Sequence, residues 1–125
     1  MIEWVAVADS RVRALLDGRY QEVDRCEWAA LDDPDAVVVG RIWGRLPTMI
    51  HLACRPRRCS VSRVRPLIRR VVEQMGRQGY PVTVTALDQR LRQSPMLRRL
   101  CARSGGTVYA VQPPLEWLAF YPGGA

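Results

Sequence analysis

The central part of the chain, residues 48–86, reads TMIHLACRPRRCSVSRVRPLIRRVVEQMGRQGYPVTVTA. Its first residues, 48–54, are mostly apolar and predict a strand. Apolar residues then recur at helical spacing with Arg, Glu and Gln between them, which predicts an amphipathic helix of about four turns over 61–79, with Pro66 in its first turn. Alternating Val and Thr predict another strand at 81–86. A strand, a helix and a strand in this order require a crossover connection, which we expect to be right-handed.

The flanking sequence adds short strands on both sides of this unit. Upstream, Val-rich stretches separated by turns of Asp, Pro and Gly predict a strand, a short helix and an antiparallel meander. Downstream, Ser94 followed by Pro95 is typical of a helix start, with Ser as the capping residue. The expected strands are 2–8, 27–31, 36–43, 48–54, 81–86, 107–111 and 115–121. Besides the long helix, we expect a short helix over 10–17, an irregular helical turn within 19–26, and a helix over 94–104.

Length and composition indicate one globular domain over residues 1–125. With 48% hydrophobic residues the chain is apolar enough to fold, which excludes wholesale disorder. No apolar run approaches the roughly 20 residues of a membrane span. The first ten residues carry Glu3 and Asp9 and no basic region, so they do not resemble a secretory signal. We therefore expect no membrane association and a cytoplasmic or other intracellular location.

The charge is distributed unevenly along the chain. All 19 basic residues are Arg, and the formal net charge is +7. Residues 1–40 contain nine acidic residues and four Arg, a net charge of −5, whereas residues 41–125 contain fifteen Arg and three acidic residues, a net charge of +12. Three kinds of partner suit this asymmetry: a polyanion such as a nucleic acid, a phosphate-bearing ligand, or other protein subunits packed head to tail.

The cysteines and the single histidine do not predict a metal site. None of the four cysteines forms a Cys-x-x-Cys pair, and a chain of this size needs no disulfide scaffold, so we expect reduced and mostly buried thiols. His51, Cys54 and Cys59 lie close in sequence, but a fourth ligand is missing and the spacing fits no zinc module.

The order of the expected elements resembles that of the GNAT N-acetyltransferases over nearly the whole chain. The resemblance implies an α/β (α+β) fold, with a mixed, mostly antiparallel seven-stranded sheet and two to three main helices. Its local support lies in residues 50–68, which resemble the family's apolar strand ending in Val-x-Pro and the loop Arg/Gln-x-x-Gly-x-Gly/Ala that opens the long helix. Residues 82–85, followed by 94–105, resemble the family's next strand and its short helix.

In this family the loop amides and the helix N-terminus hold the pyrophosphate of acetyl-CoA. Alignment without gaps from Pro56 puts Cys59, Ser62 and Val64 at the motif positions, so both glycines are replaced. Because a β-branched Val would crowd a phosphate, we interpret the loop as degenerate. A shift of two residues gives the milder Arg57-x-x-Ser60-x-Ser62. If the cofactor binds, the resemblance implies contacts from Arg57, Arg58, Cys59, Ser60, Ser62, Val64 and Ser94.

The resemblance also suggests catalytic candidates. Acyl transfer needs a base for the amine proton and often an acid for the leaving thiolate. His51, in the strand before the long helix, is the candidate base. The family's acidic Tyr corresponds to Cys101 here, and Tyr109 on the next strand is a second candidate for the acid.

We therefore expect a non-catalytic or weakly active GNAT-like protein without a cofactor. It would act as a binding or structural component of a homo- or hetero-oligomeric assembly. Compact GNAT-like proteins of this kind occur in bacteriophage particles, so the inside of a phage particle is one possible location. Two alternatives stay open: an active acetyl-CoA-dependent N-acetyltransferase, and a nucleic-acid-binding protein that uses its Arg-rich surface without reading sequence.

Overall fold

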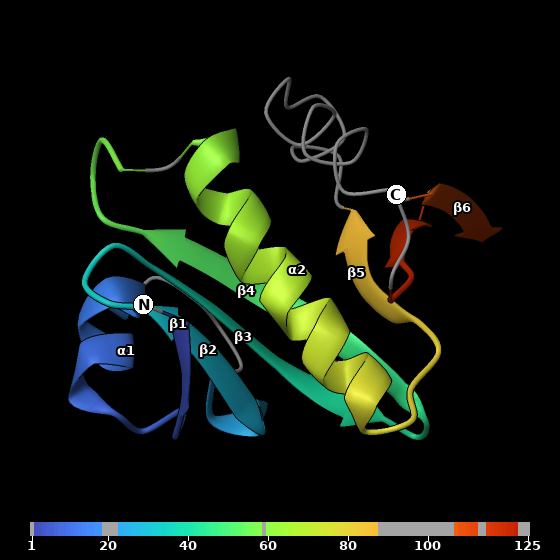
Figure 1. Ribbon diagram of the computed structural model, residues 1–125, viewed down its shortest axis with the longest axis horizontal. Coiled ribbons are helices and arrows are strands. Elements are labelled where there is room, and N and C mark those ends of the chain that lie inside the picture. Colours follow the sequence, from blue (N-terminus) through green and yellow to red (C-terminus); the bar gives the residue numbers. More distant parts are fainter. Residues whose placement is uncertain (1, 19–22, 59, 88–106, 113–114, 123–125) are drawn as a thin grey trace.

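One mixed sheet with a helix on each face forms the structure (Figure 1). The computed structural model describes residues 2–18, 23–58, 60–87, 107–112 and 115–122. Seven strands lie in the order β1-β2-β3-β4-β5-β7-β6, and within this sheet only β4 and β5 pair in parallel. The expected fold class is confirmed. The elements are β1 (Ile2–Val5), α1 (Ser10–Leu16), a 3-10 turn (Val23–Arg25), β2 (Trp28–Asp32), β3 (Ala36–Trp43), β4 (Leu46–Cys54), α2 (Val61–Arg77), β5 (Thr83–Leu87), β6 (Thr107–Gln112) and β7 (Leu115–Phe120).

Most strands differ from the predicted bounds by one or two residues, and for β1 and β4 the reason is local. β1 ends at Val5 rather than at residue 8, because the Asp9 N–H donates to the Ala6 carbonyl and turns the chain. β4 begins at Leu46, two residues early, because Gly44 has a φ of 64° and Trp43 pairs directly with Leu46. A two-residue hairpin with positive φ matches the twist of antiparallel strands. The helix expected over 94–104 lies outside the described residues.

The long helix α2 covers one face of the sheet. Its N-cap is Ser60, whose Oγ accepts from the Arg63 N–H at 3.3 Å. Pro66 is the sixth residue of the helix, so the prediction that it lies in the first turn is wrong. Its ring removes the N–H that would otherwise bond the Ser62 carbonyl, and Ser62 is exposed to water. The buried face of α2 consists of Val64, Leu67, Ile68, Val71, Val72 and Met75.

The short helix α1 covers the opposite face of the sheet. Val12, Leu15 and Leu16 of this helix pack against the β3 residues Val37 and Val39. The Asp9 carboxylate caps α1 by accepting from the Arg11 N–H at 2.9 Å. The two cores therefore lie on either side of β2 and β3. Within the described residues, neither α-helix combines the length and the apolar composition needed to cross a membrane.

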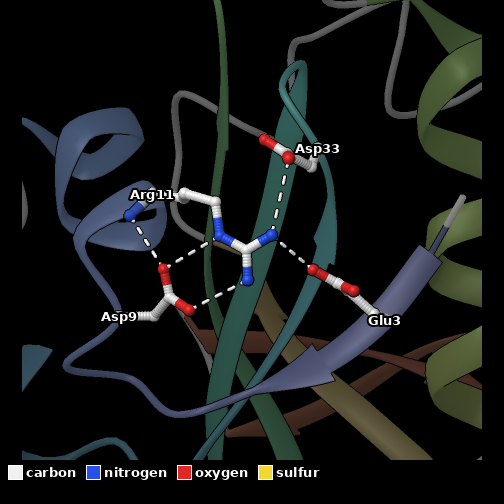
Figure 2. A network of polar contacts seen from close by, with 4 residues as sticks. All are labelled: Glu3, Asp9, Arg11 and Asp33. Atoms are coloured by element: carbon white, nitrogen blue, oxygen red, sulfur yellow. Dashed lines mark hydrogen bonds and ion pairs between the residues drawn. The ribbon is translucent and has the colours of Figure 1, made fainter.

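Arg11 joins three segments of the N-terminal region (Figure 2). Its guanidinium contacts Glu3 of β1 at 2.5 Å, Asp9 of the α1 cap at 3.0 Å and Asp33 of the β2–β3 turn at 3.4 Å. The Arg11 side chain is 42% exposed, so water screens each pair. The network therefore pairs three acidic residues of the N-terminal region with a basic residue of the same region.

Replacing Arg11 with Gln should destabilise the protein more at neutral pH than in acid. Side-chain hydrogen bonds from Arg11, followed by its backbone N–H, lower the pKa of Asp9 below the ordinary value of 3.8. A carboxyl group with a lowered folded-state pKa adds stability above its unfolded-state pKa, and that stability is lost as the pH falls through the folded-state value. The difference in Tm between parent and Arg11→Gln should therefore shrink from about pH 7 to about pH 3.

Thermal unfolding followed by circular dichroism measures this difference. Arg45→Gln is the matched control, because Arg45 is exposed and forms no ion pair with another described residue. Its Tm difference from the parent should change little with pH. A difference for Arg11→Gln that stays constant with pH would contradict the role given to this network.

Candidate functional site

β4 and β5 pair over a short distance and then separate. The paired residues are Thr48 with Val84 and Met49 with Thr85, and the Thr85 hydroxyl donates to the Met49 carbonyl at 2.9 Å. Residues 50–54 continue β4 beyond these pairs, whereas β5 stays paired with β7 along its whole length. The two strands therefore diverge toward the end of β4 that leads into α2 (Figure 1).

A bulge in β4 explains why the strands diverge. Val39 of β3 lies opposite His51 and Gly40 lies opposite Met49, so Ile50 is the extra residue. A bulge bends its strand and increases its twist. It falls directly after the last β4–β5 pair, so β4 turns away from β5 at this point. Residues 50–54 therefore extend β4 past the last residue pair that it shares with β5.

The N-terminus of α2 lies at the open end of the diverging strands (Figure 1). Helix geometry leaves the first N–H groups of α2 without carbonyl partners inside the helix. The Ser60 hydroxyl satisfies Arg63, and the Val64 N–H already bonds the Ser60 carbonyl at 2.9 Å. Within the described part of the chain, the N–H groups of residues 61 and 62 have no hydrogen-bond acceptor, so they can bind an anion, assisted by the helix dipole.

The side chains around this helix terminus are small and polar on the outside and apolar on the inside. Ser60 and Ser62 are exposed, with their hydroxyl oxygens 3.3 Å apart. Val64 is fully buried and packs with Leu67 in the core beneath α2. The bulk of Val64 is therefore directed to the sheet, away from the two free N–H groups. This geometry differs from the expectation that a β-branched residue crowds the phosphate position.

Asp35 fixes the loop that precedes α2. Its carboxylate forms a short ion pair with Arg63 and lies 3.9 Å from Arg55, while the Arg55 N–H donates to the Asp35 carbonyl at 2.8 Å. The Asp35 side chain is only 16% exposed, so these contacts are less screened than those of Arg11. Turn composition around Asp35 does not predict that this residue links the end of β4 to the first turn of α2.

Two of the predicted basic contacts lie in this loop and face water. Arg57 and Arg58 are exposed, and neither forms an ion pair with another residue that the structure describes. Arg57 has a φ of 65°, and the Arg58 N–H donates to the Arg55 carbonyl, so the loop makes a tight turn. Their guanidinium groups are available to phosphate oxygens. Cys59 and Ser94, also predicted contacts, lie outside the described residues.

His51 lies at the bulge, where the strands begin to separate. It is opposite Val39, and residues opposite each other in an antiparallel pair share a face of the sheet, so His51 is on the α1 side. Its side chain is half-buried. Cys54 packs on the other face, against the core beneath α2. These two residues therefore do not form a metal site, and no three potential metal ligands cluster among the described residues.

The remaining catalytic candidates are less well placed. Tyr109 is in β6, which pairs with β7, and β7 separates it from β5. Because neighbouring strands lie about 4.8 Å apart, the Tyr109 main chain is about 10 Å from that of β5 across the sheet. Cys101 lies outside the described residues. The structure thus brings Ser60 and Ser62 together at the α2 terminus, places His51 at the bulge on the α1 face, and leaves the candidate acids unassigned.

Comparison with solved structures places this architecture among acetyltransferases. An acetyltransferase of Bacillus subtilis in complex with CoA is 15% identical, with a TM-score of 0.73 over 96% of this chain and 97% of that chain. PaiA N-acetyltransferase from Thermoplasma acidophilum, in complex with coenzyme A, is 11% identical, with a TM-score of 0.63 over 97% and 99%. The ribosomal-protein-S18-alanine N-acetyltransferase of Escherichia coli is 10% identical, with a TM-score of 0.67 over 100% and 96%.

The sequence itself gives no such match. No family model and no curated protein matches it. The likeness at these low identities is one of fold, and it extends over nearly all of each chain. The strand order, the diverging parallel pair and the full-length structural likeness show that the chain has the fold of the GNAT N-acetyltransferases.

Proposed function

We propose that the protein binds acetyl-CoA at the N-terminus of α2 and transfers the acetyl group to an amine. The observation that carries the proposal is the separation of β4 from β5 at Met49, with the free N–H groups of α2 at the open end. Two of the structural neighbours are complexes with coenzyme A, which supports acetyl-CoA as the ligand. The expectation of a protein without a cofactor receives no support from these neighbours.

The residues at this end of the sheet fit a diphosphate. The N–H groups of residues 61 and 62 would donate to its oxygens, and the Ser60 and Ser62 hydroxyls add donors without bulk. Arg57 and Arg58 would neutralise its charge from the loop.

His51 would act as the base of the reaction. When bound, the cofactor supplies an activated acetyl thioester. A nitrogen of the His51 imidazole would accept the proton of the attacking amine, because the side chain lies at the bulge, beside the point where the strands separate. The α1 face of the sheet, on which His51 lies, is then the side from which the amine approaches. Cys101 and Tyr109 stay candidates for the acid by resemblance alone.

Replacing Ser62 with Glu should abolish most of the binding of acetyl-CoA. The new carboxylate would lie beside the phosphate position and repel it, while an acidic residue in the first turn does not harm the helix. We expect the parent to bind with a Kd on the order of 1–100 μM and Ser62→Glu to bind at least about tenfold more weakly. Isothermal titration calorimetry with acetyl-CoA measures both values.

Ser10→Glu is the matched control, because Ser10 is the exposed first residue of α1, away from the proposed site. It should leave the affinity within about twofold of the parent. If the parent binds no acetyl-CoA, the proposal is wrong, and the non-catalytic assembly component that the sequence suggests becomes the better interpretation. Equal affinities for Ser62→Glu and the parent would show that any cofactor binds elsewhere.

A further inference from the structure

The exposed side of α2 carries a row of arginines that the proposed acetyl transfer does not use. The helix contains five Arg and a single acidic residue, Glu73. Arg69 and Arg77 are exposed, and Arg65 and Arg70 are half-buried, with long stems that cover the helix surface. We call these four residues, Arg65, Arg69, Arg70 and Arg77, the α2 arginine row. Arg69, Arg70 and Arg77 lie on the side of the helix away from its buried face, and Arg65 lies at the margin of that face, where its Nε is buried.

The charge of this row is not neutralised within the described part of the molecule. No carboxylate of a described residue forms an ion pair with any of the four guanidinium groups. This includes Glu73, the acidic residue of the same helix. Five acidic residues of the N-terminal region form ion pairs with other arginines. Those with ion pairs are Glu3, Asp9 and Asp33 to Arg11, Asp24 to Arg13, and Asp35 to Arg55 and Arg63. The excess positive charge therefore stays on the surface of α2.

The shape and chemistry of the row favour an extended polyanion over a small ligand or a protein. At 1.5 Å per residue, the row from Arg65 to Arg77 is about 18 Å long, which exceeds one diphosphate. Protein interfaces are centred on apolar or aromatic anchors. Among the described residues, the exposed large apolar side chains are Trp43 and Tyr121, and neither belongs to α2. Guanidinium groups match phosphate oxygens in a bidentate manner.

We propose that the α2 arginine row binds the phosphate backbone of a nucleic acid without reading its sequence. Each Arg would contact phosphate oxygens along one strand, and such contacts position a protein on a nucleic acid but carry no base information. Binding would release counterions and would depend steeply on salt. Arg65, Arg69 and Arg70 line the same surface hollow as Ser62, so the inference is tested on the protein without acetyl-CoA.

Fluorescence anisotropy with a labelled RNA of mixed sequence, about 20 nucleotides long, tests this inference. Four phosphate contacts predict a slope of log K against log salt of about −3. Arg69→Glu should weaken binding by about tenfold or more, and the slope should become less steep by about one. Arg45→Glu, which makes the same change of net charge on the β3–β4 hairpin, should weaken binding by no more than about threefold. A second RNA of unrelated sequence should bind equally well.

The other outcomes would overturn the proposal. Equal losses for Arg69→Glu and Arg45→Glu would show that net charge, not the row, attracts the RNA. A flat salt response, or no binding at about 50 mM salt, would exclude a phosphate surface. Polyglutamate that competes as well as unlabelled RNA at equal charge would indicate an acidic protein segment as the partner. Circular dichroism of both variants shows whether they remain folded, and the exposed positions make this the expected result.

Discussion

Replacing Gly40 with alanine should destabilise the protein by at least ~3 kcal/mol, the largest effect expected of any single methyl group here. A Cβ on Gly40 would overlap the main-chain oxygen of Thr48 and the Trp28 ring atom Cζ2, and would lie 2.8 Å from Trp28 Cε2. Trp28 is 8% exposed and also packs against Trp4, with ring centroids 5.5 Å apart. Neither the tryptophan nor the neighbouring strand has room to move. Chemical denaturation at equilibrium measures the loss.

Gly44→Ala is the control for this prediction, because it adds the same methyl group to the same hairpin. A Cβ on Gly44 would meet no atom within 4 Å, although the φ of 64° disfavours any side chain. We expect a loss of only about 1–2 kcal/mol from this backbone conformation. Similar losses for the two variants would mean that close packing against Trp28 does not define the centre of the sheet. Gly40 also lies beside the bulge, so its variant should lose acetyl-CoA binding with its fold.

Replacing His51 with Gln should reduce kcat for acetyl transfer by about 10²- to 10⁴-fold, the range seen for loss of a general base. Gln is similar in size and can hydrogen-bond, but it cannot accept the amine proton. Because His51 lies on the α1 face and the cofactor phosphates are proposed at the α2 terminus, the affinity for acetyl-CoA should stay within about twofold of the parent. Release of the CoA thiol in the presence of a panel of primary amines measures turnover.

Cys54→Ser serves as the control on the same strand. Cys54 faces the core beneath α2, on the opposite side of the sheet from His51, and the substitution changes one atom. Its kcat should stay within about threefold of the parent value. Turnover by His51→Gln at the parent rate would exclude His51 as the base. If His51→Gln loses cofactor binding as well, the histidine supports the structure of the bulge rather than the chemistry.

The long helix and the meander could be predicted from the sequence because local patterns determine them. The apolar period of α2 from Val64 to Met75 assigns the buried face correctly, and the two-sided burial of β3 follows from its run of Val. The same period places Val64 on the inner face of α2. Alignment of the loop instead treats Val64 as a phosphate contact. In the structure the Val64 side chain is buried in the core beneath α2.

The candidate site could be predicted only in part, because long-range pairing creates it. Nothing in residues 48–54 indicates that Ile50 bulges, since the bulge depends on how β3 and β4 align. The separation of β4 from β5 follows from that bulge. Asp35 is 28 residues from Arg63 in the chain, and turn composition alone gives no reason to pair them. Local sequence patterns thus predict the helices and strands. The position of the candidate site depends instead on the register between β3 and β4, which those patterns do not determine.

The short β4–β5 pairing has a mechanical consequence for the whole molecule. Within the described sheet, two residue pairs join a block of four strands to a block of three strands, and α2 packs across both blocks. A molecule bound between the diverging strands would contact both blocks and would therefore couple them. Loading with such a molecule should therefore make the two blocks melt as one unit.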